Sequence, residues 1–223
     1  MLFDGEGLSA MATIDADRAG GAGRASRAAA REPTSVLVTS MGDPETPPVL
    51  SIVLAQGISA AEKMDWTIEK AVELGVASIA PLQCARSVVR LDEARAERRM
   101  QHWRRLIAAA CAQCGRNRIA SLHPPSRFEE WIVQSSGSSG ADLRIHLDPA
   151  AEVSLPTVLS GFPQPAGRLL LACGPEGGFD PGERALLAQH GWKAVRLGPR
   201  VLRTETAAMT AVAMIQGWLG DLR

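Results

Sequence analysis

The stretch that decides the fold is Arg168-Leu-Leu-Leu-Ala-Cys-Gly-Pro-Glu-Gly-Gly-Phe179. Its apolar run, residues 169–172, is typical of a strand that is buried on both faces of a parallel sheet. The glycines that follow lack a Cβ atom, so the backbone can turn sharply there and approach a ligand closely. The stretch therefore predicts a buried strand that ends in a ligand-binding loop.

A second segment, Leu197-Gly-Pro-Arg-Val-Leu-Arg-Thr-Glu-Thr-Ala207, repeats this pattern. A strand over residues 193–197 leads into a Gly-Pro turn, and Thr204 is the predicted N-cap of a helix over residues 205–219. Sheets of this kind bind ligands at such strand-to-loop junctions. Neither loop has the spacing of a phosphate-binding loop or a dinucleotide fingerprint, which disfavours ATP, GTP and NAD.

Strand and helix patterns alternate along most of the chain, and this alternation predicts an α/β fold with a mostly parallel sheet. Further strands are predicted at residues 50–55, 76–82 and 143–147. Further helices are predicted at residues 60–74, 92–114, 126–133, 156–159 (a single turn) and 181–190. Asp92 is the predicted N-cap of the longest helix, and Gly75 the predicted end of the first.

The first 48 residues follow a different pattern. Residues 1–15 have the glycine-punctuated pattern of a hairpin, and residues 16–31, rich in Ala, Arg and Gly, predict a turn or a flexible loop. A strand is predicted at residues 36–38, and the proline-rich residues 41–48 predict a linker.

Composition sets the broad class. Hydrophobic residues make up 46% of the 223 residues, enough for a core, yet no apolar stretch is long enough to span a membrane. The acidic start of the chain has no apolar signal core. Without a signal, the four cysteines at positions 84, 111, 114 and 173 are expected to be free thiols in a reducing cytoplasm. The pair Cys111-Ala-Gln-Cys114 has no partner motif, so we expect it to pack in the core and bind no metal.

Charge is balanced overall but unevenly distributed. The net charge is zero, whereas residues 86–118 hold nine arginines against Asp92, Glu93 and Glu97. Arginine forks suit phosphates and base edges, so this segment is a candidate RNA-binding face. A solvated helix surface is the alternative interpretation.

Five separated blocks resemble the SPOUT methyltransferases. More narrowly, they resemble the small-subunit ribosomal RNA methyltransferases that modify N3 of a uridine (the RsmE type). The blocks are LAQGISAAEKMDWTIEKAVELGV (54–76), ARS (85–87), CAQCGRN (111–117), GPEGGF (174–179) and LGPRVLRTETAAM (197–209). The resemblance covers roughly residues 49–223, and Ala85 stands where the family has a glutamate.

The resemblance implies a SPOUT domain over residues 49–223 with a deep trefoil knot formed after Leu197. It also implies that residues 1–48 are the last part of a PUA-like β-barrel with a linker, so the chain either starts late or has lost the first strands. A homodimer is implied, with the final helix packed across its two-fold axis. The implied partner is 16S ribosomal RNA or the small subunit, and neither DNA nor a membrane is expected.

The resemblance also implies S-adenosylmethionine as the cofactor. By residue-for-residue match, the implied cofactor-binding residues are Leu171, Gly174, Gly178, Leu197, Gly198, Leu202, Arg203 and Thr204. The candidates for binding RNA phosphates are Lys63, Lys70, Arg86, Arg116 and Arg118.

Methyl transfer to N3 of uridine requires a bent cofactor, loss of the N3 proton and stabilisation of charge on the uracil oxygens. Glu205 and Glu176 are the candidate bases, and the Arg203 fork is the candidate for holding the charge. Each has a plainer interpretation: Glu205 complements a helix dipole, Glu176 is an exposed turn residue, and Arg203 is a structural arginine paired with a carboxylate. Two alternative functions stay open, namely another SPOUT specificity such as ribose 2′-O methylation, and a non-catalytic RNA-binding protein.

Overall fold

The computed structural model describes residues 2–14, 36–137, 143–162 and 167–222. The chain divides into two compact units. The small unit comprises Met1–Thr46 with Gly115–Ile119, and the large unit comprises Pro47–Cys114 with Ala120–Arg223.

The small unit is a three-stranded antiparallel sheet with the order β1 (Leu2–Phe3), β2 (Ser9–Ile14) and β3 (Val36–Met41). The β1–β2 pairing confirms the predicted hairpin. Its turn is stabilised by the Asp4 carboxylate, which accepts hydrogen bonds from the main-chain N–H groups of residues 6, 7 and 8. The predicted strand at residues 36–38 extends to Met41, where a linker was expected. The predicted loop at residues 16–31 lies outside the described residues.

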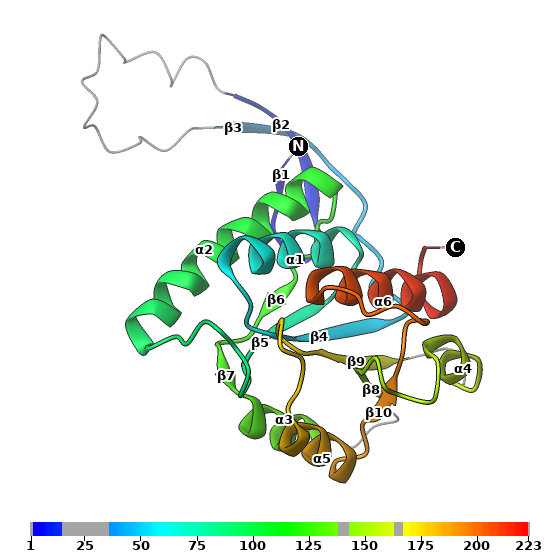
Figure 1. The fold of residues 1–223 in the computed structure, drawn as a ribbon. Helices are drawn as coiled ribbons and strands as arrows, with labels where there is room; N and C mark the ends of the chain where they lie inside the picture. Colours follow the sequence, from blue (N-terminus) through cyan, green and yellow to red (C-terminus); the bar gives the residue numbers. More distant parts are fainter. Residues whose placement is uncertain (1, 15–35, 138–142, 163–166, 223) are drawn as a thin grey trace. The chain divides into compact units, whose positions relative to one another are not determined.

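The large unit contains a seven-stranded sheet in which every pair is parallel (Figure 1). Its order is β10 (Lys193–Val195), β8 (Leu143–Leu147), β9 (Arg168–Cys173), β4 (Ser51–Gly57), β5 (Ser78–Gln83) and β6 (Ser121–Leu122), with β7 (Ser126–Arg127) also paired to β5. The apolar β4 and β9 lie side by side in the middle and are buried, as the apolar run predicted. The expectation of an α/β fold with a mostly parallel sheet is confirmed.

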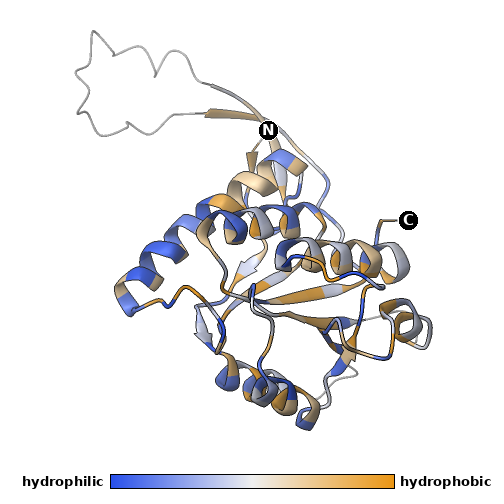
Figure 2. Ribbon diagram, viewed as in Figure 1, coloured by the Kyte–Doolittle hydropathy of each residue, from blue (hydrophilic) through white to orange (hydrophobic). Residues whose placement is uncertain are grey.

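Helices cover both faces of this sheet (Figure 1). On one face lie α1 (Ala61–Glu73), α2 (Glu93–Cys114) and α6 (Thr204–Leu219), and the short α4 (Leu155–Ser160) contacts α6. On the other lie α3 (Phe128–Ser136) and α5 (Pro181–Gln189), which pack on each other. Figure 2 shows hydrophobic residues in the central strands and many hydrophilic residues on α1 and on the N-terminal half of α2.

Most predicted ends are close to the observed ones. Asp92 accepts a hydrogen bond from Arg95 N–H at 2.9 Å, which confirms it as the cap of α2. Gly75 has the left-handed φ of +81° expected where α1 ends. The predicted helix at residues 126–133 was wrong at its start, because Ser126–Arg127 pair with β5 and α3 begins at Phe128.

The start of α6 also needs a correction. Arg203, not Thr204, occupies the N-cap position, and no side chain caps the helix there. Thr204 is already helical, and its hydroxyl donates instead to Gly174 O at 2.5 Å. The preceding strand is shorter than predicted and ends at Val195, so residues 196–203 form a loop.

Candidate functional site

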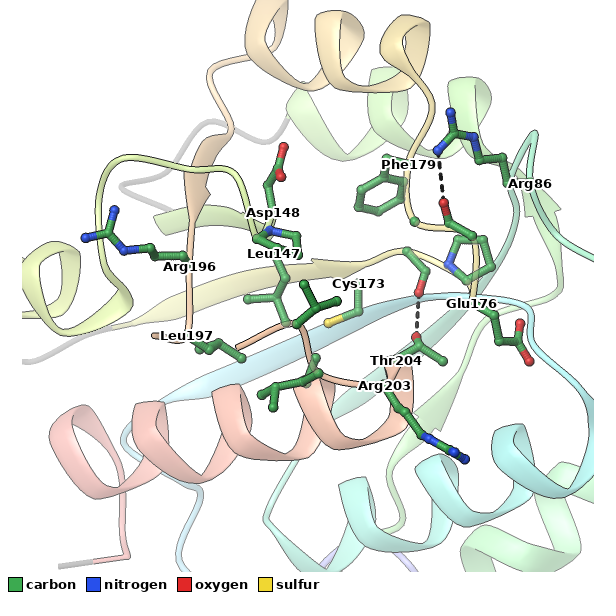
Figure 3. Close-up of a pocket in the computed structure, with 18 of the residues that line it drawn as sticks. Arg86, Leu147, Asp148, Cys173, Glu176, Phe179, Arg196, Leu197, Arg203 and Thr204 are labelled. Atoms are coloured by element: carbon green, nitrogen blue, oxygen red, sulfur yellow. Dashed lines mark hydrogen bonds between the residues drawn. The ribbon is translucent and has the colours of Figure 1, made fainter. Parts of the chain in front are cut away.

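A cavity of about 390 Å³ opens at the carboxyl ends of β8, β9 and β10 in the large unit (Figure 3). Residues from both glycine-containing loops line it, as the two strand-to-loop junctions predicted. The site residues named from the sequence that line this cavity are Lys63, Arg86, Gly174, Glu176, Gly178, Leu197, Leu202, Arg203 and Thr204. Those that do not line it are Lys70, Arg116, Arg118, Leu171, Gly198 and Glu205.

The wall of the cavity is largely apolar. Its apolar side chains include Leu147, Cys173, Phe179, Val195, Leu197, Val201 and Leu202. Burial raises the pKa of the Cys173 thiol, so the sulfur stays neutral and acts as a packing group. Leu171 is fully buried in β9 behind this wall, so it supports the site from the core. An apolar cavity of this size suits a flat aromatic ligand.

The glycine loop after β9 brings main-chain groups to the cavity. Gly178 has a left-handed φ of +66°, and its N–H donates to Pro175 O at 2.8 Å, which closes a tight turn. A Cβ atom on Gly174 would lie 3.0 Å from the backbone of Gly178 and Phe179, so the turn is too tight for a side chain there. Gly198, in the second loop, also has a positive φ, of +110°.

Thr204 joins the two loops. Its hydroxyl donates to Gly174 O and accepts a hydrogen bond from Gln56 Nε2 at 3.0 Å. Gln56 is fully buried at the end of β4, and the same amide also contacts Gly174 O at 3.4 Å. This clamp fixes β4, the first glycine loop and the start of α6 in one arrangement, and sequence reasoning missed the role of Gln56.

The two predicted carboxylates have different surroundings. Glu176 accepts hydrogen bonds from Ala60 N–H at 3.0 Å and from Lys63 Nζ at 3.3 Å. Partial burial raises the pKa of Glu176, but these bonds and the Lys63 charge outweigh burial and lower it. Glu205 lies in the first turn of α6, outside the cavity, and its Oε2 is buried without a hydrogen-bond partner among the described residues.

Arg203 is exposed at the rim, and Figure 3 shows its side chain pointing away from Cys173 and Phe179. Within the described part of the chain its guanidinium makes no ion pair, so the interpretation as a carboxylate-paired structural arginine finds no support. Its main chain is fixed, because Arg203 O accepts from Ala207 N–H at 2.8 Å in the first turn of α6.

The predicted phosphate-binding residues are dispersed. Lys63 and Arg86 lie at the cavity, where Arg86 donates to Gly177 O at 3.0 Å (Figure 3). Lys70 lies on α1 and is paired with Glu69 and Glu73, each at 2.7 Å. Arg116 and Arg118 belong to the small unit, where the Arg118 guanidinium donates to the main-chain oxygen of Glu45.

Several lining residues were not predicted. Asp148 directly follows β8 and approaches Arg184 of α5 at 3.8 Å, while Arg196 follows β10 and donates to the main-chain oxygens of residues 151 and 152. These positions had a usable signal, because ligand sites gather where parallel strands end. Among the described residues, no group of three or more His, Cys, Asp and Glu side chains is arranged to hold a metal ion. None of the described helices combines the length and apolarity needed to cross a membrane.

A buried histidine lies behind the cavity and makes the fold sensitive to acid. His146 packs edge-on against Phe179, and burial lowers its pKa to about 4, well below the ordinary value of 6.5. At pH values between about 4 and 6.5, the His146 imidazole is protonated in the unfolded chain but stays neutral in the folded protein. The free energy of unfolding therefore decreases as the pH falls below about 6.5.

We expect the unfolding free energy to drop by about 2 kcal/mol between about pH 7 and pH 5 from this group alone. Urea denaturation of the wild type and of His146→Leu at both pH values measures it. The leucine variant should show the smaller pH dependence, and equal dependence in both proteins would contradict the assignment to His146.

The chain resembles known proteins in both sequence and structure. Residues 45–216 match the model of the RNA methyltransferase domain, so fold and site define an RNA methyltransferase. The chain is 32% identical to ribosomal RNA small subunit methyltransferase E of Mycobacterium bovis over 218 residues, 96% of this chain and 77% of that protein. The chain therefore belongs to the ribosomal RNA small subunit methyltransferase E family. It spans about two thirds of the length of several other curated relatives.

Two solved structures are similar throughout. Ribosomal RNA small subunit methyltransferase E from Neisseria gonorrhoeae, bound to S-adenosyl methionine, has a TM-score of 0.81 and 28% identity and covers 100% of this chain and 84% of that one. A putative methyltransferase from Legionella pneumophila, in complex with the same cofactor, has a TM-score of 0.83 and 34% identity, with coverage of 99% and 83%.

Proposed function

We propose that this chain transfers a methyl group from S-adenosylmethionine to N3 of a uridine in 16S ribosomal RNA of the small subunit. The observation that carries the proposal is the cavity, in which two glycine loops, clamped by Thr204, meet an apolar wall at the carboxyl ends of three parallel strands. The proteins similar to this chain include a small-subunit ribosomal RNA methyltransferase and two solved structures bound to S-adenosylmethionine.

The cavity fits the cofactor in size and chemistry. Its volume, about 390 Å³, lies in the range of small-molecule sites, and its apolar side chains suit an adenine ring. The main chain around Gly174, Gly178 and Leu197 would supply polar groups for the adenine edge and the ribose. When bound, the cofactor supplies an electrophilic methyl group, and the loops would hold it so that this methyl faces the RNA.

The protein must also manage the charge and proton of the uracil ring. We assign Arg203 to the negative charge that develops on O2 or O4, because it makes no ion pair in the described chain and stands at the N-terminal, positive end of the α6 dipole. Arg86 and Lys63, at the same cavity, would bind the flanking phosphates.

For proton removal, Glu205 is better supported than Glu176, because the hydrogen bonds of Glu176 stabilise its ionised form and weaken it as a base. Glu205 has a buried oxygen without a donor among the described residues, although it lies outside the cavity. If Glu205 accepts the proton, Glu205→Gln should cut kcat sharply while cofactor affinity stays unchanged, because the amide keeps the shape of the side chain but cannot accept a proton. Wild-type single-turnover rates in this variant would remove the assignment.

Assembly and knotting are part of the proposal. A homodimer across α6 is supported by the half-buried or exposed Ala213, Met214 and Trp218 on its outer side. The trefoil knot after Leu197 is proposed from the resemblance of residues 197–209 to the SPOUT methyltransferases. We further propose that residues 1–48 are a PUA-like segment preceding a SPOUT domain at residues 49–223. We also propose that the chain works in the cytoplasm, where its four free cysteines stay reduced.

The decisive experiment identifies the methylated nucleoside. Purified protein is incubated with labelled S-adenosylmethionine and small subunits from a strain that lacks the gene, and the digested 16S RNA is analysed by mass spectrometry. We expect 3-methyluridine as the labelled product. A ribose-methylated nucleoside would establish the alternative SPOUT specificity. Cofactor and RNA binding without any product would establish the non-catalytic alternative.

A further inference from the structure

A second hollow in the large unit lies over the N-terminal half of α2, away from the glycine loops. It is a groove of about 430 Å³, which we call the arginine groove. It is lined by Val89, Arg90, Leu91, Arg95, Arg98, Arg99 and His102. No carboxylate is among these residues, and Figure 2 shows this half of α2 as strongly hydrophilic.

The spacing along α2 explains why these charges gather. Residues 95, 98, 99 and 102 are three or four positions apart, so they share one face of the helix. An adjoining face, with Met100, Trp103 and Ile107, is buried in the core. Burial of that apolar face therefore fixes the direction in which the arginines project.

Local carboxylates neutralise little of this charge. Arg95 pairs with Asp92 at 3.4 Å, but both side chains are more than 60% exposed, so the pair is weak. Asp65 is occupied by His102 at 2.7 Å and by the Trp103 ring N–H at 3.1 Å. Among the described residues Arg90 and Arg99 form no ion pair. The groove therefore holds a net positive charge, increased by the N-terminal dipole of α2.

The groove is joined to the candidate site by a short, fixed loop. Arg86 lines the cavity and Arg90 lines the groove, so their Cα atoms lie at most about 14 Å apart. The loop is held by Ala85 N–H, which donates to Glu183 at 2.7 Å, and by Leu91 O, which accepts from Gln83 at 3.4 Å. A few nucleotides of RNA would span this distance.

We propose that the arginine groove binds the phosphate backbone of ribosomal RNA next to the nucleotide that enters the cavity. The groove combines several guanidinium groups that few carboxylates neutralise, which suits a polyanion better than a single anion. Phosphate binding of this kind sets the register of the RNA and carries no base specificity. The inference rests on the proposed function for the identity of the RNA, whereas phosphate binding can be tested without it.

The test compares Arg98→Gln/Arg99→Gln with Arg104→Gln, a control on the same helix. Arg104 is exposed and lies outside the groove. Affinity for a short labelled RNA is measured by fluorescence anisotropy over a series of salt concentrations. The double variant should bind more weakly, and its salt slope should fall by about 0.7 to 0.9 for each phosphate that the protein no longer neutralises. The control should bind as the wild type does.

Two further measurements distinguish an effect on RNA binding from an effect on cofactor binding or on the methyl-transfer step. Cofactor affinity by calorimetry should be unchanged in the double variant, which also shows that the fold is intact. On small subunits, KM should rise while kcat stays constant. If the wild type methylates nothing, the proposed function fails, yet the salt slopes still decide the role of the groove.

Two results would overturn the proposal. One is a double variant whose salt slope and KM match those of Arg104→Gln. The other is weaker binding to small subunits with unchanged binding to naked RNA, which would mean that the groove binds a ribosomal protein.

Discussion

Gly178→Val is expected to lower the affinity for S-adenosylmethionine by about 30-fold or more. Valine is strongly disfavoured at the φ of +66° found there, so the free loop should relax out of this conformation, and cofactor binding must restore it at a cost of about 1–2 kcal/mol. The added methyl groups also enter the cavity that Gly178 lines, at a further cost of about 1–3 kcal/mol. Together these effects correspond to at least about 30-fold in the dissociation constant. Isothermal titration calorimetry measures it directly.

Gly191→Val is the matched control for this experiment. Gly191 also has a left-handed φ, of +73°, and at both glycines a new Cβ would meet no atom within 4 Å. Gly191 follows α5 and lies outside the cavity, so its substitution strains the backbone in the same way without touching the site. Equal affinities in the two variants would remove the first glycine loop from the cofactor site.

The sequence predicted the large unit well because its signals are local and strong. The apolar run at residues 169–172 is buried because it lies between β4 and β8. Asp92 caps the start of α2 with its side chain, and Gly75 marks the end of α1 with its left-handed backbone. The prediction failed where a tertiary contact outweighed a local preference. Thr204 has the side chain of a helix cap, but its hydroxyl bonds to Gly174 O, thirty residues earlier.

The site was predicted only in part, because some of its residues are held by tertiary contacts that have no local signal in the sequence. Gly174 and Gly178 were found by their residue-for-residue match to the family, and the left-handed φ of Gly178 agrees with a glycine there. Gln56 was missed because nothing near it in sequence indicates that its amide reaches both Gly174 and Thr204. Asp148 was missed although it directly follows a predicted strand. Of the predicted phosphate residues, Lys70 and Arg118 are bonded within the protein, and the long-range contact of Arg118 has no signal in the sequence.

Arg203→Lys is expected to reduce kcat by about 10² to 10³, the usual cost of removing one donor that stabilises a developing anion. Lysine keeps the positive charge but lacks the planar fork that can hold a uracil oxygen in a fixed direction. The backbone at Arg203 is fixed by the first turn of α6 and by the neighbouring Thr204 clamp, so a shorter-reaching ammonium cannot compensate by moving the main chain. Because the loss is confined to the transition state, cofactor affinity should stay close to that of the wild type.

The control for Arg203 is Arg200→Lys. Arg200 is also an exposed arginine that lines the cavity, but it precedes the start of α6 by several residues and is not adjacent to the clamp. Single-turnover methylation of small subunits, with enzyme in excess, isolates the chemical step from product release. We expect a large loss in Arg203→Lys and little change in Arg200→Lys. If both variants lose activity equally, the rim acts as a general positive field for RNA. If neither variant loses activity, other donors stabilise the developing charge on the uracil oxygen. The main-chain N–H groups at the start of α6 are the first candidates, because the first turn of a helix leaves its N–H groups without helical partners. The positive end of the α6 dipole lies there as well.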